Sequence, residues 1–515
     1  GLLLYGAFIQ MRFKRSDKIH ILTIMLAAIL IQSIIGMIQY YGVFQGSIRL
    51  FDKLVFPWGT FKQKNVMTTF MATGIGISLY LLSKNRDLFQ SKLFTALIFL
   101  IPLTGSIIIV AIKSKAGYLG LIATILPQLF VVNYQRKKIR LWFGILFTGL
   151  FIGWISPKVA ATLMPETPSL YQRDIKDQMK TVNTRLVYYE SSLKMLMDNK
   201  LFGVGYGRYT RELRKYLAKR RATQPDSDFR LDEFIDHPHS EILLWISEGG
   251  VVPLIGFIII FLAYLAMIRK RKKQEILTSI SLIAPITFHA VIELPFFISV
   301  PHWITFLFLI SFFDEPSYTY KLSFRKVFLP LAVLLPVMVL YNMFNVYKNA
   351  RLLTNYKALS VYKGVNEYEL LLQIKKPGPM YLVYEYEILK SMLDLGLKTK
   401  NTEILETVVE KAKYFVQHSP IISAYEIRVI ALKALGRKYQ AMALEYNARY
   451  LYPDPTEGTE WLYLIDDQLE NEIVELKMYF LIDAAYFVYD QDEFNRYSAN
   501  IEVIFQLLDT NTKKE

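Results

Sequence analysis

Long apolar runs constrain the fold of this chain more than any other feature. An α-helix needs roughly 20 apolar residues to cross the hydrocarbon core of a bilayer. With 53% hydrophobic residues and a mean hydropathy of +0.26, the 515-residue chain is far more apolar than a soluble protein requires. The expected spans are 18–42, 65–83, 91–112, 117–133, 141–157, 241–267, 276–296, 298–312 and 326–346. The sequence therefore predicts an all-α polytopic membrane bundle.

Basic residues gather in alternate loops between these spans. They occur at Arg12–Arg15, Lys84–Lys92, Tyr134–Arg140, Arg269–Lys273 and Phe313–Lys326. Loops rich in Lys and Arg stay in the cytoplasm, so we expect the segments near 43–64, 158–240 and 294–301, and everything after 347, to lie outside. The chain has no cysteine, which fits an oxidising compartment and excludes disulfides and thiolate metal sites.

Four parts follow from this topology. Residues 1–157 form the N-terminal part of the bundle, 158–240 a large external loop, 241–347 the C-terminal part of the bundle, and 348–515 a soluble helical domain. Gly1–Met11 resembles the tail of a further span, and the chain opens inside an apolar run, so we expect upstream helices that this sequence lacks.

The soluble part differs from the rest in charge and pattern. Residues 350–515 carry 19 Lys and Arg against 25 Asp and Glu, so this part has a charge of −6 and the rest of the chain +21, for +15 in all. The basic charge therefore belongs to the membrane topology, and nucleic-acid binding is disfavoured. Within Ile421–Pro453, a glycine, two alanines and a proline stand at the offsets of a tetratricopeptide helix-turn-helix: Gly436, Ala441, Ala448 and Pro453. A repeat array and irregular helical packing both explain this segment.

The stretch Asp236-His-Pro-His-Ser-Glu241 places two imidazoles where the external loop meets an apolar helix. Pro238 suits the first turn of a helix, which predicts that His237 caps the helix and that His239 lies in its first turn. The helix dipole there favours a neutral imidazole, which can accept a proton, and the free N–H groups can seat an anion such as a diphosphate. A capping pair without chemistry is the alternative.

Other polar groups cluster at the same expected face. Phe61-Lys-Gln-Lys-Asn65 precedes a span, Lys113-Ser-Lys-Ala-Gly117 separates two spans, and Arg185 lies with Tyr188 and Tyr189 in the large loop. Each alone is also explained as a solvated flank of a membrane helix. Their gathering at one face favours a site for a ligand that arrives from the bilayer.

Further candidates have competing explanations. His289 and Glu293 are four residues apart in an apolar helix, which fits either a functional pair or a buried structural pair. His302 follows the Glu293-Leu-Pro295 kink and is expected near the outer surface. Gly203-Val-Gly-Tyr-Gly207 has no preceding strand and no following P-loop Lys, so it predicts a turn after a helix. Asp226-Ser-Asp228 imitates a metal-binding Asp-x-Asp but is expected outside, as a solvated acidic loop.

In order along the chain, these segments resemble the bacterial O-antigen ligase superfamily. The residues that carry the likeness are Phe61-x-Gln63-x-Asn65, Ser114-Lys-Ala-Gly117, Arg185, Lys200–Gly207, His237-Pro-His239-Ser-Glu and Glu293-Leu-Pro295. Within the superfamily, the chain is most similar to the protein O-oligosaccharyltransferases that glycosylate pilin-like proteins. The likeness runs from the first span to about residue 313, and the acidic helical extension is similar to that subgroup's C-terminal domain.

The resemblance implies transfer of an oligosaccharide from undecaprenyl diphosphate to a Ser or Thr hydroxyl of a pilin-like protein. The enzyme would sit in the bacterial inner membrane, with its site and C-terminal domain in the periplasm, and would need no metal or other cofactor. The family's essential histidine matches His239. Lys115 stands where the family often has Arg, and Ser240 where Asn is common. Lysine keeps the positive charge of arginine but lacks its bidentate fork.

Under this hypothesis His239 is the base or orienter, with His237 beside it, and Arg185 and Lys115 hold the diphosphate. Gln63 and Asn65 orient sugar or phosphate. Tyr189, Glu293 and His302 are accessory candidates. A glycolipid or growing polysaccharide is an alternative acceptor, although the soluble domain favours a folded protein. A transporter with a His289–Glu293 proton relay would call for inverted repeats, which the sequence does not display. A scaffold whose C-terminal domain gathers partners is the third class.

Overall fold

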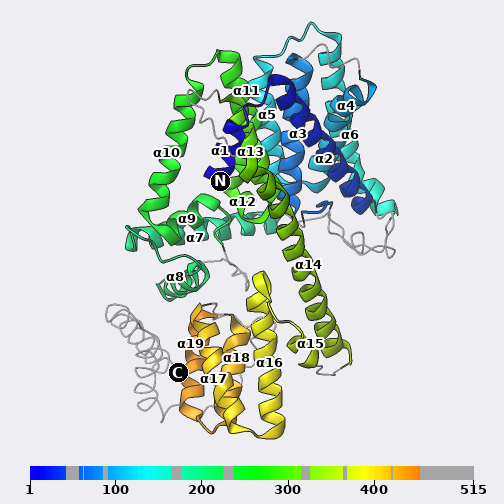
Figure 1. Cartoon of the computed structure of the whole chain (residues 1–515). Coiled ribbons are helices and arrows are strands. Elements are labelled where there is room, and N and C mark those ends of the chain that lie inside the picture. The colour runs from blue at the N-terminus through cyan, green and yellow to red at the C-terminus, as the bar shows by residue number, and fades with distance from the viewer. Residues whose placement is uncertain are drawn as a thin grey trace. The chain divides into compact units, whose positions relative to one another are not determined.

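The computed structural model describes residues 1–41, 57–61, 63–84, 91–163, 175–223, 237–314, 325–363, 368–418 and 421–452. Every regular element in these ranges is a helix, which confirms the predicted fold class (Figure 1). The chain forms two compact units. The first contains Gly1–Tyr206 and Asp236–Lys321, and the second contains Gly207–Asp228 and Leu322 onward.

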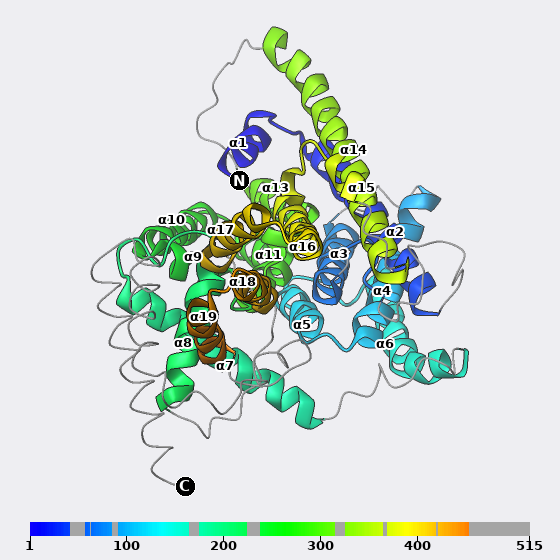
Figure 2. The ribbon, with the colours of Figure 1, turned by 90° about the horizontal axis from the view of Figure 1, so that it is seen from below.

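The first unit is a bundle built around one fully surrounded helix, α3 (Lys64–Lys84). It packs against α2 (Arg15–Tyr40), α4 (Lys92–Ile112), α5 (Lys115–Leu129) and α11 (Lys273–Ile292), as Figure 2 shows from below. Small residues allow this close approach. A Cβ added to Gly74 would lie 2.8 Å from Ile29 Cγ2, and one added to Gly76 would lie 2.1 Å from Thr124 Oγ1.

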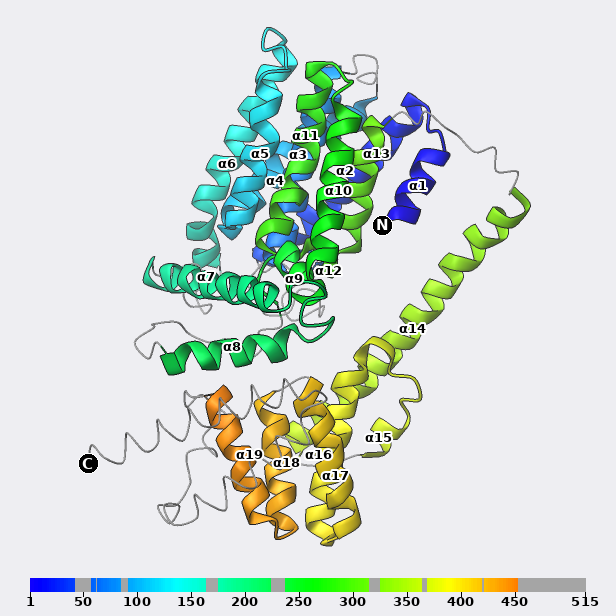
Figure 3. The same cartoon turned by 90° about the vertical axis from the view of Figure 1, so that its left-hand side faces the viewer.

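The remaining helices of this unit surround the core or close its end. They are α1 (Leu2–Gln10), α6 (Lys137–Leu163), α7 (Ile175–Asp198), α9 (Glu241–Gly249), α10 (Val251–Ile268), α12 (Pro295–Ile298) and α13 (Val300–Phe313). Figure 3 shows α7 lying across the end of the bundle, transverse to the long helices. Helix α9 packs against α7, α10, α11 and α12, so it is the element that joins the transverse helix to the bundle.

Six helices in the described ranges are long and apolar enough to cross a membrane: α2, α3, α4, α6 over Lys137–Val159, α10 and α11. The chain is therefore a multi-pass membrane protein. The expected spans 117–133 and 298–312 correspond to α5 and α13, which have 15 and 14 residues. Each helix is shorter than the roughly 20 residues of a typical span, so whether these two segments cross the membrane stays a prediction. The expected span 326–346 lies within α14 (Arg325–Lys363), many of whose side chains are outside the described residues.

The expected span 241–267 was wrong as a single helix, because the chain breaks at Gly250. This glycine has φ +69°, and a Cβ there would lie 2.5 Å from Leu201 O and 2.6 Å from Gly203 N. Gly203 (φ +65°) is equally crowded, since its Cβ would lie 2.4 Å from Glu248 C. The two glycines let the turn after α7 cross the end of α9, where Val204 N and Gly205 N donate to Ser247 O and Glu248 O at 2.9 Å. This turn matches the prediction for Gly203–Gly207.

The second unit gathers α8 (Tyr209–Thr223), α14, α15 (Tyr368–Leu372), the 3₁₀ turn Gly378–Met380, α16 (Tyr381–Thr399), α17 (Thr402–His418), α18 (Ile422–Ala434) and α19 (Lys438–Leu451). Helices α18 and α19 form the predicted hairpin, with Gly436 in its turn at φ +75° and with Ala441 and Ala448 fully buried. Helix α8 packs on α19, and the Arg214 guanidinium lies 4.7 Å from the ring centre of Tyr452. Whether the hairpins form a true repeat array stays a prediction.

Candidate active site

The two loop histidines precede α9 instead of belonging to it. Ser240 is the N-cap of α9 and accepts from Leu243 N, so the expected cap at His237 and the expected helical position of His239 were wrong. The chain turns sharply at His239 (φ +54°), and His239 N donates to His237 Nδ1 at 3.1 Å. This bond makes Nδ1 of His237 an acceptor, which fixes the tautomer of that ring. His237 therefore shapes the turn that presents His239.

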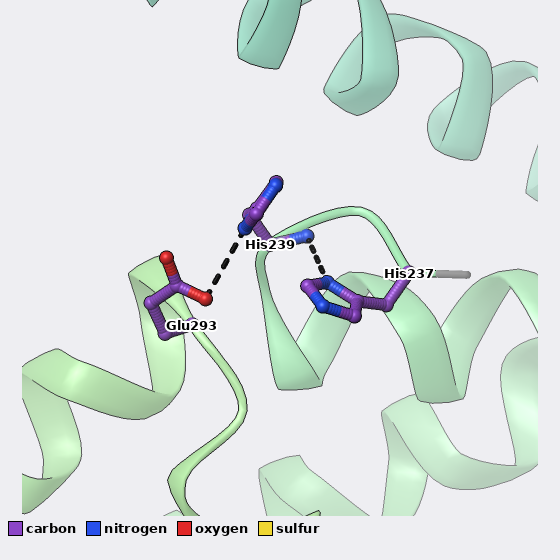
Figure 4. Close-up of side chains that lie close together, drawn as sticks. All are labelled: His237, His239 and Glu293. Atoms are coloured by element: carbon purple, nitrogen blue, oxygen red, sulfur yellow. Dashed lines mark hydrogen bonds and ion pairs between the residues drawn. The ribbon is translucent and has the colours of Figure 1, made fainter. Parts of the chain in front are cut away.

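The carboxylate of Glu293 contacts the imidazole of His239. Helix α11 ends at Ile292, and Glu293 is extended (φ −161°), so Glu293 and His289 do not share a helical face as expected. The carboxylate is almost fully buried, and its Oε2 lies 3.2 Å from His239 Nδ1 (Figure 4). Its other oxygen, Oε1, accepts from Arg185 Nη2 at 2.7 Å. One carboxylate thus joins two residues that the sequence had placed in separate roles.

The electrostatics of this cluster favour a permanently ionised Glu293. Burial raises the pKa of its carboxyl, but the hydrogen bond and charge of His239, the charge of Arg185 and that of His289 outweigh burial and lower the pKa to about 2. An ionised carboxylate accepts the Nδ1 proton of His239 and orients the ring. Nε2 of His239 then points away from Glu293, as Figure 4 shows, and in this tautomer it can accept a proton.

Helix α7 supplies the cation and a second contact to the histidine turn. Arg185 is about one-third exposed at its side chain, and its Nε is buried without a hydrogen-bond partner among the described residues. Tyr189, one turn further along, donates to His239 O at 3.2 Å. The ring of Tyr188 stacks on His239 with 6.5 Å between centroids. The transverse helix therefore holds both the backbone and the ring of His239.

Asn65 lies at the start of α3 and supports the carboxylate. Its Nδ2 donates to Glu293 Oε1 at 3.2 Å, and its Oδ1 accepts from Ser114 Oγ at 2.9 Å. Ser114 is also the N-cap of α5, accepting from Gly117 N, and Lys115 follows it as an exposed first residue of that helix. Gln63 Oε1 accepts from Val66 N and caps α3. Asn65 is thus occupied by protein contacts, while Lys115 is on the surface beside them.

His289 and His302 form a separate buried group beneath the site. Thr69 Oγ1 lies 2.8 Å from His289 Nδ1 and 3.2 Å from His302 Nε2, and Ser299 Oγ lies 2.8 Å from His302 Nδ1. Both rings have no exposed surface. The expectation that His302 lies near the outer surface was therefore wrong, because α13 begins only after the short helix α12 and turns this ring inward. These histidines brace the ends of α3, α11 and α13.

The convergence on Glu293 was missed by sequence reasoning, which paired this residue with His289 through helical spacing. The same reasoning gave no role to Glu241, although it is in the quoted histidine motif. Each residue had a signal in the sequence. For Glu293, the signal was Pro295, which ends the helix nearby. For Glu241, it was the position at the start of an apolar helix, where a buried carboxylate is costly unless it is hydrogen-bonded.

Three side chains of this cluster are close enough together to coordinate a metal ion. His237, His239 and Glu293 offer ligand atoms within 4.8 Å of one another. However, Nδ1 of His237 already accepts a backbone N–H, and the Arg185 guanidinium occupies the carboxylate. A cation would displace both contacts and lie beside a positive charge. The metal-free chemistry expected from the sequence stays a prediction.

Two family models match the chain. A model described as O-antigen ligase matches residues 96–258, and one described as virulence factor membrane-bound polymerase, C-terminal, matches residues 277–461. The chain belongs to the O-antigen ligase superfamily. No curated protein and no solved structure matches it.

Membership in this superfamily identifies an O-antigen ligase or polymerase type of membrane enzyme, which moves glycosyl groups from a lipid-linked oligosaccharide. The first matched region contains Ser114, Arg185 and His239, and the second contains Glu293. The bond between His239 and Glu293 therefore joins the two regions at the centre of the candidate site.

Proposed function

We propose that this protein transfers an oligosaccharide from an undecaprenyl-diphosphate carrier to a Ser or Thr hydroxyl of a secreted, pilin-like protein. The observation that carries the proposal is the contact of one buried carboxylate with both His239 and Arg185. In this contact, the imidazole that we assign as the proton acceptor shares a carboxylate with the guanidinium that we assign to the diphosphate. Glycosyl transfer from a diphosphate needs both of these groups.

In the proposed reaction, the acceptor hydroxyl oxygen attacks the anomeric carbon of the glycan. The bond between that carbon and the diphosphate oxygen breaks, and its electron pair leaves with the diphosphate. The hydroxyl proton passes to Nε2 of His239, whose Nδ1–H is held by Glu293. Arg185, together with the exposed Lys115, compensates the charge that develops on the leaving group. About one-third of the Arg185 side chain is exposed, which leaves part of it accessible to a phosphate while Glu293 holds Nη2.

We further propose that the site faces the periplasm and that the membrane is the bacterial inner membrane. The site lies at the N-terminal end of α3 and the C-terminal ends of α4 and α11. Lys84 ends α3, Lys92 begins α4, and the basic segment Arg269–Lys273 leads into α11, so these charges lie at the opposite ends of the three helices. Basic loops mark the cytoplasmic side, so the candidate site belongs to the other side.

A second acceptor class competes with the first. The match to a polymerase C-terminal model over residues 277–461 favours a growing glycan, or another glycolipid, as the acceptor. The chemistry at His239 would be the same. What differs is the partner that binds near the helical second unit.

Reconstitution tests the proposal. The purified protein is placed in liposomes with undecaprenyl diphosphate oligosaccharide and a candidate pilin, and the intact mass of the pilin is measured. A mass gain of one oligosaccharide that depends on His239 supports protein glycosylation. Extension of the lipid-linked glycan with an unchanged pilin mass would support the polymerase instead. No consumption of the donor with any of these acceptors would refute both.

A further inference from the structure

Glu241 is a buried carboxylate for which the proposed reaction has no use. It is the first residue of α9 and two residues after His239, and only 6% of its surface is exposed. Burying an ionisable side chain costs free energy, and an apolar residue would pack there without this cost. The role of Glu241 therefore lies in the contacts that it makes.

The backbone N–H and the side-chain carboxylate of Glu241 both bind the segment that carries Glu293. Its backbone N–H donates to Glu293 O at 3.2 Å, and its side-chain Oε2 accepts from Phe296 N at 3.1 Å. Pro295 has no N–H, so Phe296 carries the first backbone donor after the Glu293-Leu-Pro295 kink. Glu241 thus binds two points of one short turn, three residues apart.

The turn is itself anchored to α13. The ring of Phe296 lies 4.5 Å from that of Trp303 and 5.0 Å from that of Phe306, centroid to centroid. On the other side, Ser240 caps α9 and fixes the direction in which the chain runs from His239 into the helix. The bonds of Glu241 therefore connect a fixed histidine turn to a fixed carboxylate turn.

From this geometry we propose that Glu241 is a positioning residue that holds His239 at hydrogen-bond distance from Glu293. This inference rests on the proposed function, because it gives His239 the role of proton acceptor. The side chain acts through its acceptor oxygen and not through its charge. Without the hydrogen bonds that the Glu241 carboxylate accepts from this turn, the Glu293 turn would be held less firmly against α9, and the gap between the imidazole and the carboxylate would widen.

Three variants separate this role from simple structural support. Glu241→Gln keeps an acceptor oxygen at the same reach, Glu241→Ala removes it, and Glu241→Asp keeps the charge but withdraws the oxygen by one methylene. Displacing a catalytic group by about 1 Å costs roughly 100-fold in rate. We expect kcat to fall by roughly 10- to 100-fold in the Ala and Asp variants. We expect KM for the lipid-linked donor to stay within about threefold, since Arg185 is untouched, and the Gln variant to keep near-normal kcat.

The matched control is Glu190→Ala on α7, which removes an exposed carboxylate paired with Lys194 and should leave transfer unchanged. Size-exclusion profiles and melting temperatures establish that each variant is folded. Should Glu241→Ala not fold, the comparison of Asp with Gln still decides the question. A Gln variant as impaired as the Ala or Asp variant, or an Ala or Asp variant with wild-type kcat, would overturn the proposal.

A second readout needs no substrate and so separates this inference from the proposed function. With ¹⁵N-labelled histidine, the bonded Nδ1–H of His239 gives a resonance that is assigned by its disappearance in His239→Ala. We expect Glu241→Ala to lose or shift this resonance and Glu241→Gln to keep it. If no glycan is transferred by the wild type, the proposed function fails, while this spectrum still tests Glu241. An unchanged resonance in Glu241→Ala would refute the positioning role.

Discussion

At Glu293, groups from separate parts of the sequence share one carboxylate: His239 before α9, Arg185 on α7 and Asn65 on α3. Because charge-assisted hydrogen bonds are stronger than neutral ones, this convergence fixes the imidazole and the guanidinium together. Asn65, which sequence reasoning assigned to sugar or phosphate, instead holds the carboxylate. Residues from separate motifs are therefore coupled through one carboxylate.

His239 is expected to be essential and His237 helpful. A positioned base typically contributes about 10²–10⁴-fold in rate, so His239→Ala should lower kcat by that order. His237→Ala removes the acceptor of the His239 backbone N–H and the edge contact with the His239 ring but leaves the imidazole of His239 in place, so a loss of roughly 10-fold or less is expected. Single-turnover transfer by purified, folded variants measures both. Wild-type rates in His239→Ala would remove this residue from the mechanism.

The stability of the protein should depend on the protonation of Glu241. Burial raises the pKa of its carboxyl to about 7, against the opposing backbone hydrogen bonds from Phe296 and Phe297. A carboxyl whose folded pKa is raised stabilises the fold below its unfolded pKa of about 4.5, and this contribution is lost as pH rises through about 7. Between pH 5 and pH 8 we expect a loss of roughly 2 kcal/mol from this group.

Melting curves across that range measure this effect, with Glu241→Gln as the comparison. The Gln variant cannot ionise, so its melting temperature should change less between pH 5 and pH 8 than that of the wild type. Parallel pH profiles for the two proteins would contradict the assignment of this loss to Glu241.

At the scale of elements, the break between α9 and α10 carries the histidine turn. Gly250→Ala places a Cβ against the backbone of Leu201 and Gly203 and forces a positive φ on a residue that disfavours it. Such backbone strain costs on the order of 1–3 kcal/mol. We therefore expect a lower melting temperature and reduced transfer. Gly256→Ala, in α10 with open space around it, is the matched control and should behave as the wild type.

The sequence predicts these elements unevenly, for physical reasons. Runs of apolar residues locate α2, α3, α4, α6 and α11, because a helix that is long and apolar enough to cross a membrane is recognised from its length and composition. Composition does not mark the break at Gly250, which depends on a crossing segment from the turn after α7. In the same way, spacing placed Glu293 beside His289, whereas the end of α11 turns it toward His239. Local patterns predict helices, but contacts between distant segments determine the site.

At the scale of the whole molecule, topology remains the largest prediction. The external loop and the C-terminal helices are expected on one side of the membrane, opposite the basic turn at Arg269–Lys273. The cysteine-free chain suits labelling of single cysteines in intact cells. Lys200→Cys and Lys398→Cys should react with an impermeant maleimide, and Lys270→Cys should react only after lysis. Protection of Lys398→Cys would place the C-terminal helices in the cytoplasm and contradict this topology.

The central claim is that His239 and Glu293 act as one unit in glycosyl transfer, and a double-mutant cycle tests it most directly. The rate of transfer from undecaprenyl diphosphate oligosaccharide is measured for the wild type, His239→Ala, Glu293→Gln and the double variant. If Glu293 acts through His239, the loss in the double variant should be far smaller than the product of the two single losses, because residues that act as a unit are not additive. Losses that multiply, with the double variant slower by the product of both single effects, would contradict the account.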